Sequence, residues 1–417
     1  MTKPLAPFAM FAAVLAVAGL PIYIHAPKFF VDNYGVGLAS LGAVLFGLRL
    51  LDVVQDPALG WLSRRLGSHR PIAVAVAATL MALSMIGLFA ITPPIAPLAW
   101  FTLTLAGLFS AYSFLTISFY AQGVSKARTI GENGHVRLAG WRETGALIGV
   151  CLASIAPVAL TTITDRPFAL FSALFAVAAL AAVIAMRSEW QAPPPDQNTG
   201  LRPYLENPMT RRLLIIALVN AMPVAVTSTL FLFFVEYRLS SPGWEGPLLL
   251  LLFLAAALSA PFWSRAAVTF GAKPTLLVGM GLAIVAFAGT VFLEAGDLVP
   301  FALICLASGM ALGADLTLLP ALFAEASAEV APDAAEGFGL WSFASKFSLA
   351  IAAVLFLPLL EKAGFNPGTG EITASATTTL TFFYATIPLG LKLIALALLA
   401  ATPLAPKSRN VLQGAHT

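Results

Sequence analysis

Long apolar runs recur along the whole chain, and they restrict its fold more than any other feature. A helix that crosses the hydrocarbon core of a bilayer needs about 20 mostly apolar residues. Stretches such as 248–258 also lack the period-two alternation of a membrane barrel strand. We therefore expect an all-α membrane protein. The runs predict twelve spanning helices, at about 7–26, 38–62, 72–91, 97–122, 138–161, 166–186, 212–236, 245–266, 274–293, 299–324, 338–360 and 379–403.

The composition excludes a water-soluble domain. Of the 417 residues, 59% are hydrophobic and 10% are charged, whereas a soluble domain carries about 25% charged residues. Both cysteines, Cys151 and Cys305, fall inside apolar runs, which is typical of small buried residues and not of a disulfide or metal site. The first apolar run has only Lys3 before it and is interpreted as a first helix, not as a cleaved signal.

Positively charged residues divide unevenly between alternate connections. With the N-terminus in the cytoplasm, fifteen of the 23 Lys and Arg fall in cytoplasmic segments, four in outer segments and four within spans. Lys and Arg accumulate on the cytoplasmic side of membrane proteins. We therefore expect a bacterial cytoplasmic (inner) membrane protein with both termini in the cytoplasm. The connection between the tenth and eleventh segments is instead acidic, with Glu325, Glu329, Asp333 and Glu336.

The longest connection divides the spans into two sets of six. It holds a polar, proline-rich stretch at 192–198, which is typical of a linker. We expect an N-terminal half at 1–190, a cytoplasmic linker at 191–211 and a C-terminal half at 212–417.

The two halves share a short pattern that suggests an internal repeat. Pro57 lies ten residues before Gly67, and Pro261 lies ten residues before Gly271, so an offset of 204 residues relates both pairs. Two related six-helix halves describe a transporter with its site between them. The alternative is that proline and glycine recur in connections by chance.

Charged residues inside spans are the strongest functional signal. Arg49, Asp52 and Asp56 follow one another at spacings of three and four, which places them on one helical face. Ionised groups at membrane depth usually face a protein interior and serve function. A carboxylate pair can coordinate a small cation, or one of its members can hold a proton. Lys346, in the eleventh segment, can reach the same cavity and replace the cation; the alternative is a fixed ion-pair network that only joins the halves.

The basic turn after the second segment sets topology and is a candidate gate. It carries Arg64, Arg65 and Arg70. A gating role would require bonds from this turn to helix ends of the other half in one state.

Several motifs together resemble one transporter family. The second segment reads Arg49-x-x-Asp52-x-x-x-Asp56-Pro57-x-x-Gly60-Trp61, and the fourth contains Tyr112-Ser113 and Thr116 to Tyr120. The fifth contains Arg137-x-x-x-Trp141-Arg142, and the eleventh runs from Phe338-Gly339 to Lys346, followed by Gly364-Phe365. This pattern is similar to the glycoside-pentoside-hexuronide:cation symporters, the melibiose permease-like branch of the major facilitator superfamily.

The resemblance implies roles for individual residues. It implies a cation site at Asp52, Asp56 (also the metal ligands if the ion is Na⁺), Ser113 and Lys346, and sugar stacking by Tyr120. The further candidate substrate contacts are Arg49, Thr116, Arg142, Asp315 and Trp341. Two departures weaken the case for a galactoside: the first segment carries no acid, and Thr116 stands where a second acid is expected. Asp315 could compensate, or it could only pack near a kink at Pro320.

These observations lead to an expected function with open alternatives. We expect a cation-coupled (Na⁺ or H⁺) symporter of a sugar-like or glycoside-like solute, working by alternating access as a monomer in the bilayer. A lysolipid or other amphiphile is the alternative substrate. A non-transporting receptor or assembly factor would not need the acid pair. We expect no enzymatic activity, because no zinc-protease, nucleophile-elbow or phosphate-loop motif is present, and we expect no cofactor and no nucleic-acid partner.

Overall fold

The computed structural model describes residues 5–190, 200–331, 334–363 and 374–403, and within them the chain is helical without a strand. The N-terminal bundle comprises α1 (Ala6–Val17), α2 (Leu20–Tyr34), α3 (Leu38–Arg65), α4 (Arg70–Phe89), α5 (Pro97–Ile130), α6 (Gly134–Leu160) and α7 (Pro167–Met186). After α8 (Arg202–Glu206), the C-terminal bundle comprises α9 (Pro208–Phe233), α10 (Glu245–Phe270), α11 (Ala272–Ala288), α12 (Leu298–Val330), α13 (Ala335–Lys362), α14 (Ala374–Thr381) and α15 (Ile387–Ala400). Two π-helical turns, η2 (Phe234–Arg238) and η5 (Phe382–Thr386), extend α9 and join α14 to α15.

The expectation of an all-α membrane protein is confirmed. Within the described residues, nine helices are long and apolar enough to cross a membrane. Each predicted segment falls on helix, but many helices run further than hydropathy indicates. For example, α5 ends at Ile130 and α12 ends at Val330. The backbone hydrogen bonds of a helix do not require apolar side chains, so a helix continues past the point where its residues turn polar.

The first predicted helix, at 7–26, is wrong as a single element. The chain breaks between α1 and α2 at Ala18 and Gly19, and Pro21 stands in the first turn of α2. Proline lacks the N–H of a helix interior but suits a first turn, so it favours a fresh start here. The second piece then reaches Tyr34, where Gly35 adopts a left-handed conformation (φ 64°) and ends it.

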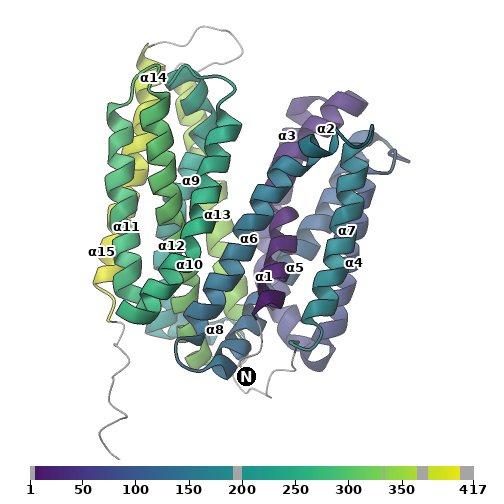
Figure 1. Cartoon of the computed structure of the whole chain (residues 1–417), viewed down its shortest axis with the longest axis vertical. Helices are drawn as coiled ribbons and strands as arrows, with labels where there is room; N and C mark the ends of the chain where they lie inside the picture. Colours follow the sequence, from purple (N-terminus) through teal and green to yellow (C-terminus); the bar gives the residue numbers. More distant parts are fainter. Residues whose placement is uncertain (1–4, 191–199, 332–333, 364–373, 404–417) are drawn as a thin grey trace, which may run out of the picture.

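The helices form two bundles that approach each other at one end. Figure 1 shows α1–α7 on one side and α9–α15 on the other, closest near α8 and the N-terminus and apart near α2 and α14. One buried apolar cluster includes residues of both bundles, among them Ile117 and Val136 from the first and Leu213 and Phe338 from the second. Of the predicted linker, 191–199 falls outside the described residues. Its described part contains α8, at the same end of the bundles (Figure 1), and α9 already begins at Pro208, inside the expected linker range.

The turns after α3 and α10 share a glycine with positive φ, although a 3₁₀ turn (Gly67–His69) follows α3 and α11 follows α10 directly. Gly67 (φ 46°) and Gly271 (φ 95°) both take positive φ just before the next helix begins. Glycine adopts this conformation without the steric cost that a Cβ brings. The matching turns, at an offset of 204 residues, support the internal repeat.

Candidate functional site

The acid pair lies in the wall between the two bundles. Asp52 and Asp56 stand one turn apart on α3, with relative exposures of 3% and 0%. A carboxylate at such a position is costly unless an opposite charge or hydrogen-bond donors surround it. The surrounding groups therefore decide what this pair does.

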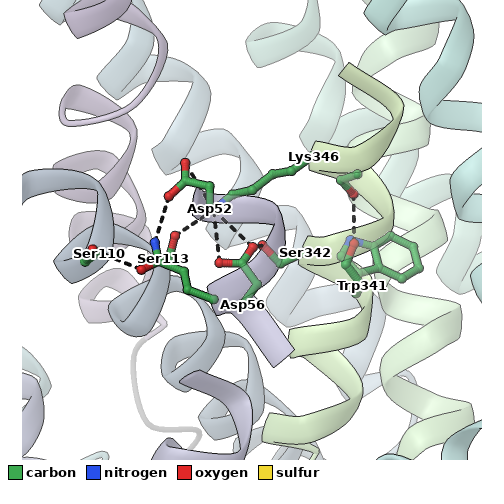
Figure 2. Close-up of polar contacts among 9 residues, drawn as sticks. Asp52, Asp56, Ser110, Ser113, Trp341, Ser342 and Lys346 are labelled. Carbon is green, nitrogen blue, oxygen red and sulfur yellow. Dashed lines mark hydrogen bonds and ion pairs between the residues drawn. The ribbon is translucent and has the colours of Figure 1, made fainter. Parts of the chain in front are cut away.

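Lys346 of α13 supplies the opposite charge from the other bundle. Its Nζ lies 3.0 Å from Asp56 Oδ2 and 3.6 Å from Asp52 Oδ2, and it donates to Ser113 Oγ on α5 at 2.6 Å. Figure 2 shows the lysine side chain reaching across to both carboxylates. The structure thus brings together all four residues of the expected cation site.

Three further polar residues complete this cluster, and the sequence reasoning missed them. Ser342 Oγ donates to Asp56 Oδ2 at 2.5 Å, and Gln55 Nε2 donates to Asp52 Oδ1 at 2.8 Å. Ser110 Oγ donates to Gln55 Oε1 at 3.0 Å (Figure 2). Helical spacing could have identified two of them, because Ser342 lies four residues before Lys346 and Gln55 lies three residues after Asp52, on the same helical faces.

The same two helices also meet through glycines and a second ion pair. A Cβ at Gly60 would lie 2.8 Å from Ala335 O, and a Cβ at Gly339 would lie 2.9 Å from Asp56 O. One turn beyond Gly60, Arg64 Nη1 lies 2.8 Å from Glu336 Oε2. Asp56, Gly60 and Arg64 recur every four residues, so one face of α3 carries the acid, the close contact and the second ion pair along α13.

The contact between α6 and α10 mirrors that between α3 and α13. Ser264, at the offset of 204 from Gly60, donates from its Oγ to Val136 O at 3.0 Å. A Cβ at Gly140 would lie 2.5 Å from Ser264 Oγ. No charge pair stands in this second contact at the positions of the acids, because Ala256 and Ala260 occupy them. The repeat therefore keeps the packing and differs in the chemistry.

A second polar cluster joins α5 and α6 beside this contact. Arg142 Nε donates to Glu143 Oε1 at 2.7 Å, and Tyr120 OH donates to the same oxygen at 3.0 Å. The Arg142 guanidinium lies 3.7 Å from the centroid of the Tyr120 ring, and the ring centroid of Phe338 on α13 lies 5.0 Å from the same centroid. Arg142 and Glu143 are each 5% exposed. Both are therefore buried residues.

The remaining candidates are more scattered. Arg49 and Thr116 are partly buried on α3 and α5, one turn from Asp52 and Ser113 respectively. Trp341 packs on Phe323 at 4.9 Å. At the end of α3, Arg65 lies over Trp61, and at the start of α4 buried Arg70 donates to Ser63 O at 3.1 Å. Arg64 crosses to the other bundle through its ion pair with Glu336.

Asp315 lies inside the C-terminal bundle. It pairs with Lys392 of α15, whose Nζ also donates to Asn220 Oδ1 of α9 at 2.7 Å. Lys392 is 6% exposed, because a buried acid and a buried amide hold it inside the bundle. Asp315 also lines a pocket whose described walls belong to its own bundle. Its contacts therefore do not support the compensating role that was expected for it at the central cavity.

Comparisons with known proteins place this fold. Residues 7–405 match the family described as MFS/sugar transport protein. A bacterial homologue of the iron transporter ferroportin, solved in an outward-facing state, superposes with a TM-score of 0.69 at 14% identity, over 95% of this chain and 99% of that chain. The human organic anion transporter MFSD10 (TETRAN) gives 0.64 at 17% identity, over 95% and 98%. The search of curated proteins returned no similar sequence.

The fold and the match over nearly the whole chain define a membrane transporter of the major facilitator type. The chain belongs to the MFS/sugar transport protein family. This membership agrees with the resemblance to melibiose permease-like symporters.

Proposed function

We propose that this protein couples the uptake of a sugar-like solute to a small cation, Na⁺ or H⁺, by alternating access. One observation carries the proposal: Lys346 of the C-terminal bundle is bound to Asp52, Asp56 and Ser113 of the N-terminal bundle. A cation that binds the same carboxylates must compete with this lysine. Cation occupancy then changes the bond that joins the two halves.

The chemistry of the acid pair suits a hard cation. Its carboxylate oxygens, with the hydroxyl of Ser113, are the ligands that Na⁺ or a similar ion prefers. Two carboxylates and one ammonium leave one negative charge among these groups. A bound cation or proton can neutralise that charge, or it can take the place of the lysine at the carboxylates. In either case the negative charge of the pair favours the binding of one positive charge.

Coupling follows from the shared helices. α3 and α13 carry the Asp56–Lys346 contact and, two turns of α3 away, the Arg64–Glu336 ion pair. A ligand shifts a two-state protein only through its different affinity for the two states. Release of Lys346 weakens the contact of α3 with α13, so the cation favours the state in which that contact is loosened. By linkage, the solute that prefers this state also strengthens cation binding.

The cluster of Tyr120, Arg142 and Glu143 is the best candidate for solute contact. Arg142 Nη2 is buried without a hydrogen-bond partner in the described part of the chain. A guanidinium N–H in this condition can donate to a solute hydroxyl. Because Arg142 covers one face of the Tyr120 ring and Phe338 neighbours it, we assign Tyr120 hydrogen bonding in this state and not the stacking that the family resemblance implies.

An amphiphile is the second candidate solute. Two features favour it: α1 carries no acid, and Thr116 stands where the related sugar carriers are expected to have one. We further propose a monomer in a bacterial cytoplasmic membrane, with the Arg64 end of the bundles facing the cytoplasm. The bias of Lys and Arg supports this orientation. A non-transporting receptor would not need the acid pair.

Uptake into proteoliposomes tests the proposal. Labelled sugars and lysolipids are offered with an imposed Na⁺ or H⁺ gradient, using the wild type, Asp52→Asn and Asp56→Asn. We expect one solute class to accumulate in the wild type and accumulation to vanish in both variants. Asp165→Asn, at an exposed carboxylate, is the matched control. Normal gradient-driven accumulation by both acid variants would disprove the coupling.

A further inference from the structure

A separate cavity lies inside the C-terminal bundle. It has a volume of about 120 Å³, is partly open, and is lined by α9, α10, α11, α12, η5 and α15. Its walls are mostly apolar, with Phe231, Leu252 and Phe287 among them. None of the residues described as lining it belongs to the N-terminal bundle or to α13, so it is distinct from the acid pair and its lysine.

One end of this cavity is polar and incompletely bonded. Lys392 Nζ donates to Asp315 Oδ2 and to Asn220 Oδ1. Asp315 is 7% exposed, and its other oxygen, Oδ1, is buried without a hydrogen-bond partner among the described residues. Ser308 Oγ, two turns earlier on α12 and also in the wall, is in the same condition. A buried carboxylate oxygen without a hydrogen-bond donor costs about 1–3 kcal/mol or more. A ligand that donates a hydrogen bond to Asp315 Oδ1 would remove this cost.

Charge decides which donor fits. Asp315 and Lys392 form a neutral pair, and Asn220 adds no charge. A further ionised group would have to be desolvated inside an apolar bundle without a counter-charge. The missing donor is therefore a neutral O–H or N–H, carried on a molecule whose remaining surface is apolar.

Irregular backbone surrounds the cavity. Pro223 stands inside α9, where it cannot donate a backbone hydrogen bond, Pro388 stands in the first turn of α15, and Tyr384 lies in the π-helical turn η5. All three line the cavity. A π-helical turn is energetically unfavourable and is found frequently at functional sites. Two prolines and a π-helical turn around one space indicate that the bundle is shaped to leave it open.

The size and entrance restrict the ligand further. An engineered apolar cavity of about 150 Å³ binds benzene, so about 120 Å³ suits one small ring or a short chain. Val224 and Ser228, one turn apart on α9, line the cavity and are exposed. A ligand can therefore enter past α9 from outside the bundle.

We propose that this cavity binds a small neutral amphiphile, of the class of a phenol or a short alcohol, which donates its hydroxyl to Asp315 Oδ1. The apolar body lies among Phe231, Leu252 and Phe287. Because no described lining residue comes from the other bundle, binding does not depend on the acid pair. The site is additional to the solute path of the proposed transport cycle.

Photolabelling in lipid nanodiscs tests this site. The probe is 3-azidophenol, and phenyl azide, which lacks the hydroxyl, is its matched partner. We expect adducts on peptides of α9, α10 and α12 that line the cavity, with unlabelled phenol competing. The phenol probe should label them about ten- to a hundredfold more efficiently than phenyl azide, the ratio expected for one hydrogen bond to a charged group.

Two kinds of variant make the test decisive. Ala283→Phe fills the cavity from α11 and should remove cavity labelling by both probes, whereas Val285→Phe, at a 75% exposed position of the same helix, should not. The paired change Asp315→Leu with Lys392→Met removes both charges together and should lower the probe ratio to about one. Asp52→Asn should leave labelling unchanged, which separates this proposal from the transport mechanism. Equal labelling by both probes, or labelling insensitive to Ala283→Phe, would overturn it.

Discussion

The ammonium of Lys346 lies 3.0 Å from Asp56 Oδ2 and bonds to Ser113 Oγ at 2.6 Å, so α13 of one bundle is tied to α3 and α5 of the other. This single side chain is the point at which the charge of the acid pair and the contact between the bundles depend on each other. A substitution here should therefore separate cation binding from coupled movement.

Lys346→Ala should abolish gradient-driven accumulation of solute while leaving the acids able to bind the cation. Without the ammonium, two buried carboxylates lose their counter-charge, and the cation no longer competes with a bond between the bundles. Uptake in proteoliposomes and cation binding by calorimetry measure the two effects. Lys362→Ala, at an exposed position of the same helix, is the control. Wild-type accumulation by Lys346→Ala would show that the lysine takes no part in coupling.

Arg64→Ala should shift the bundles away from the arrangement seen here. Glu336 is 1% exposed and would keep only the backbone N–H of Gly200 among its bonds described here, at a cost of about 1–3 kcal/mol, or at least fivefold in the equilibrium. Spin labels at Asn33 on α2 and at Ser240 after η2 measure the distance between the bundles at the end where they lie apart (Figure 1), with Cys151 and Cys305 replaced by alanine. This distance should become shorter, because the bundles close at this end when the contact at the Arg64 end opens.

The charge exchange Arg64→Glu with Glu336→Arg is the control for that experiment. It should restore most of the wild-type distance distribution, because the pair is formed again in reverse. A distribution unchanged by Arg64→Ala would mean that this ion pair does not hold the two bundles.

Gly60→Ala should hinder the same arrangement by steric contact. Its Cβ would lie 2.8 Å from Ala335 O, and such overpacking costs about 1–3 kcal/mol. We expect transport at least fivefold slower, in a rate assay at saturating solute. Gly47→Ala on the same helix meets nothing within 4 Å, so it should gain helix propensity and keep the wild-type rate. Similar rates in the two variants would contradict the close approach of α3 to α13.

Arg142→Lys should raise the KM for the solute about ten- to a hundredfold. Lysine keeps the charge but loses the planar group that bonds Glu143 and covers Tyr120, and hydrogen bonds to charged groups contribute about 1.5–3 kcal/mol. Tyr120→Phe should raise KM only about threefold, because it removes one neutral hydroxyl. The matched control is Arg137→Lys, at an exposed position of α6. An unchanged KM in Arg142→Lys would remove this cluster from the solute site.

Local features predicted most of the helices. Hydropathy is a property of neighbouring residues, so the predicted apolar segments fell on helices, with a break inside the first of them. It could not show the break at Gly19 or the π-helical turns, because these depend on backbone geometry and packing. Nor could it show how far α5 and α12 continue once their side chains become polar.

The partners of two lysines in apolar helices could not be predicted from the local sequence. Lys346 and Lys392 look alike in sequence, each a single base in an apolar run. The first reaches across to the acids of the other bundle, and the second pairs with Asp315 inside its own. Their partners lie 290 and 77 residues away, so only the packing of distant helices determines which acid each one meets.

The sequence by itself determined that this chain is a helical membrane protein with an acid pair on one helical face, since burial cost and helical spacing follow from residue type and order. The tertiary structure alone decided that this face meets α13. There Gly60 and Gly339 allow a close approach, and Lys346 and Glu336 supply the opposite charges. Such contacts form between residues far apart in the chain, and their geometry depends on how the two bundles fit together.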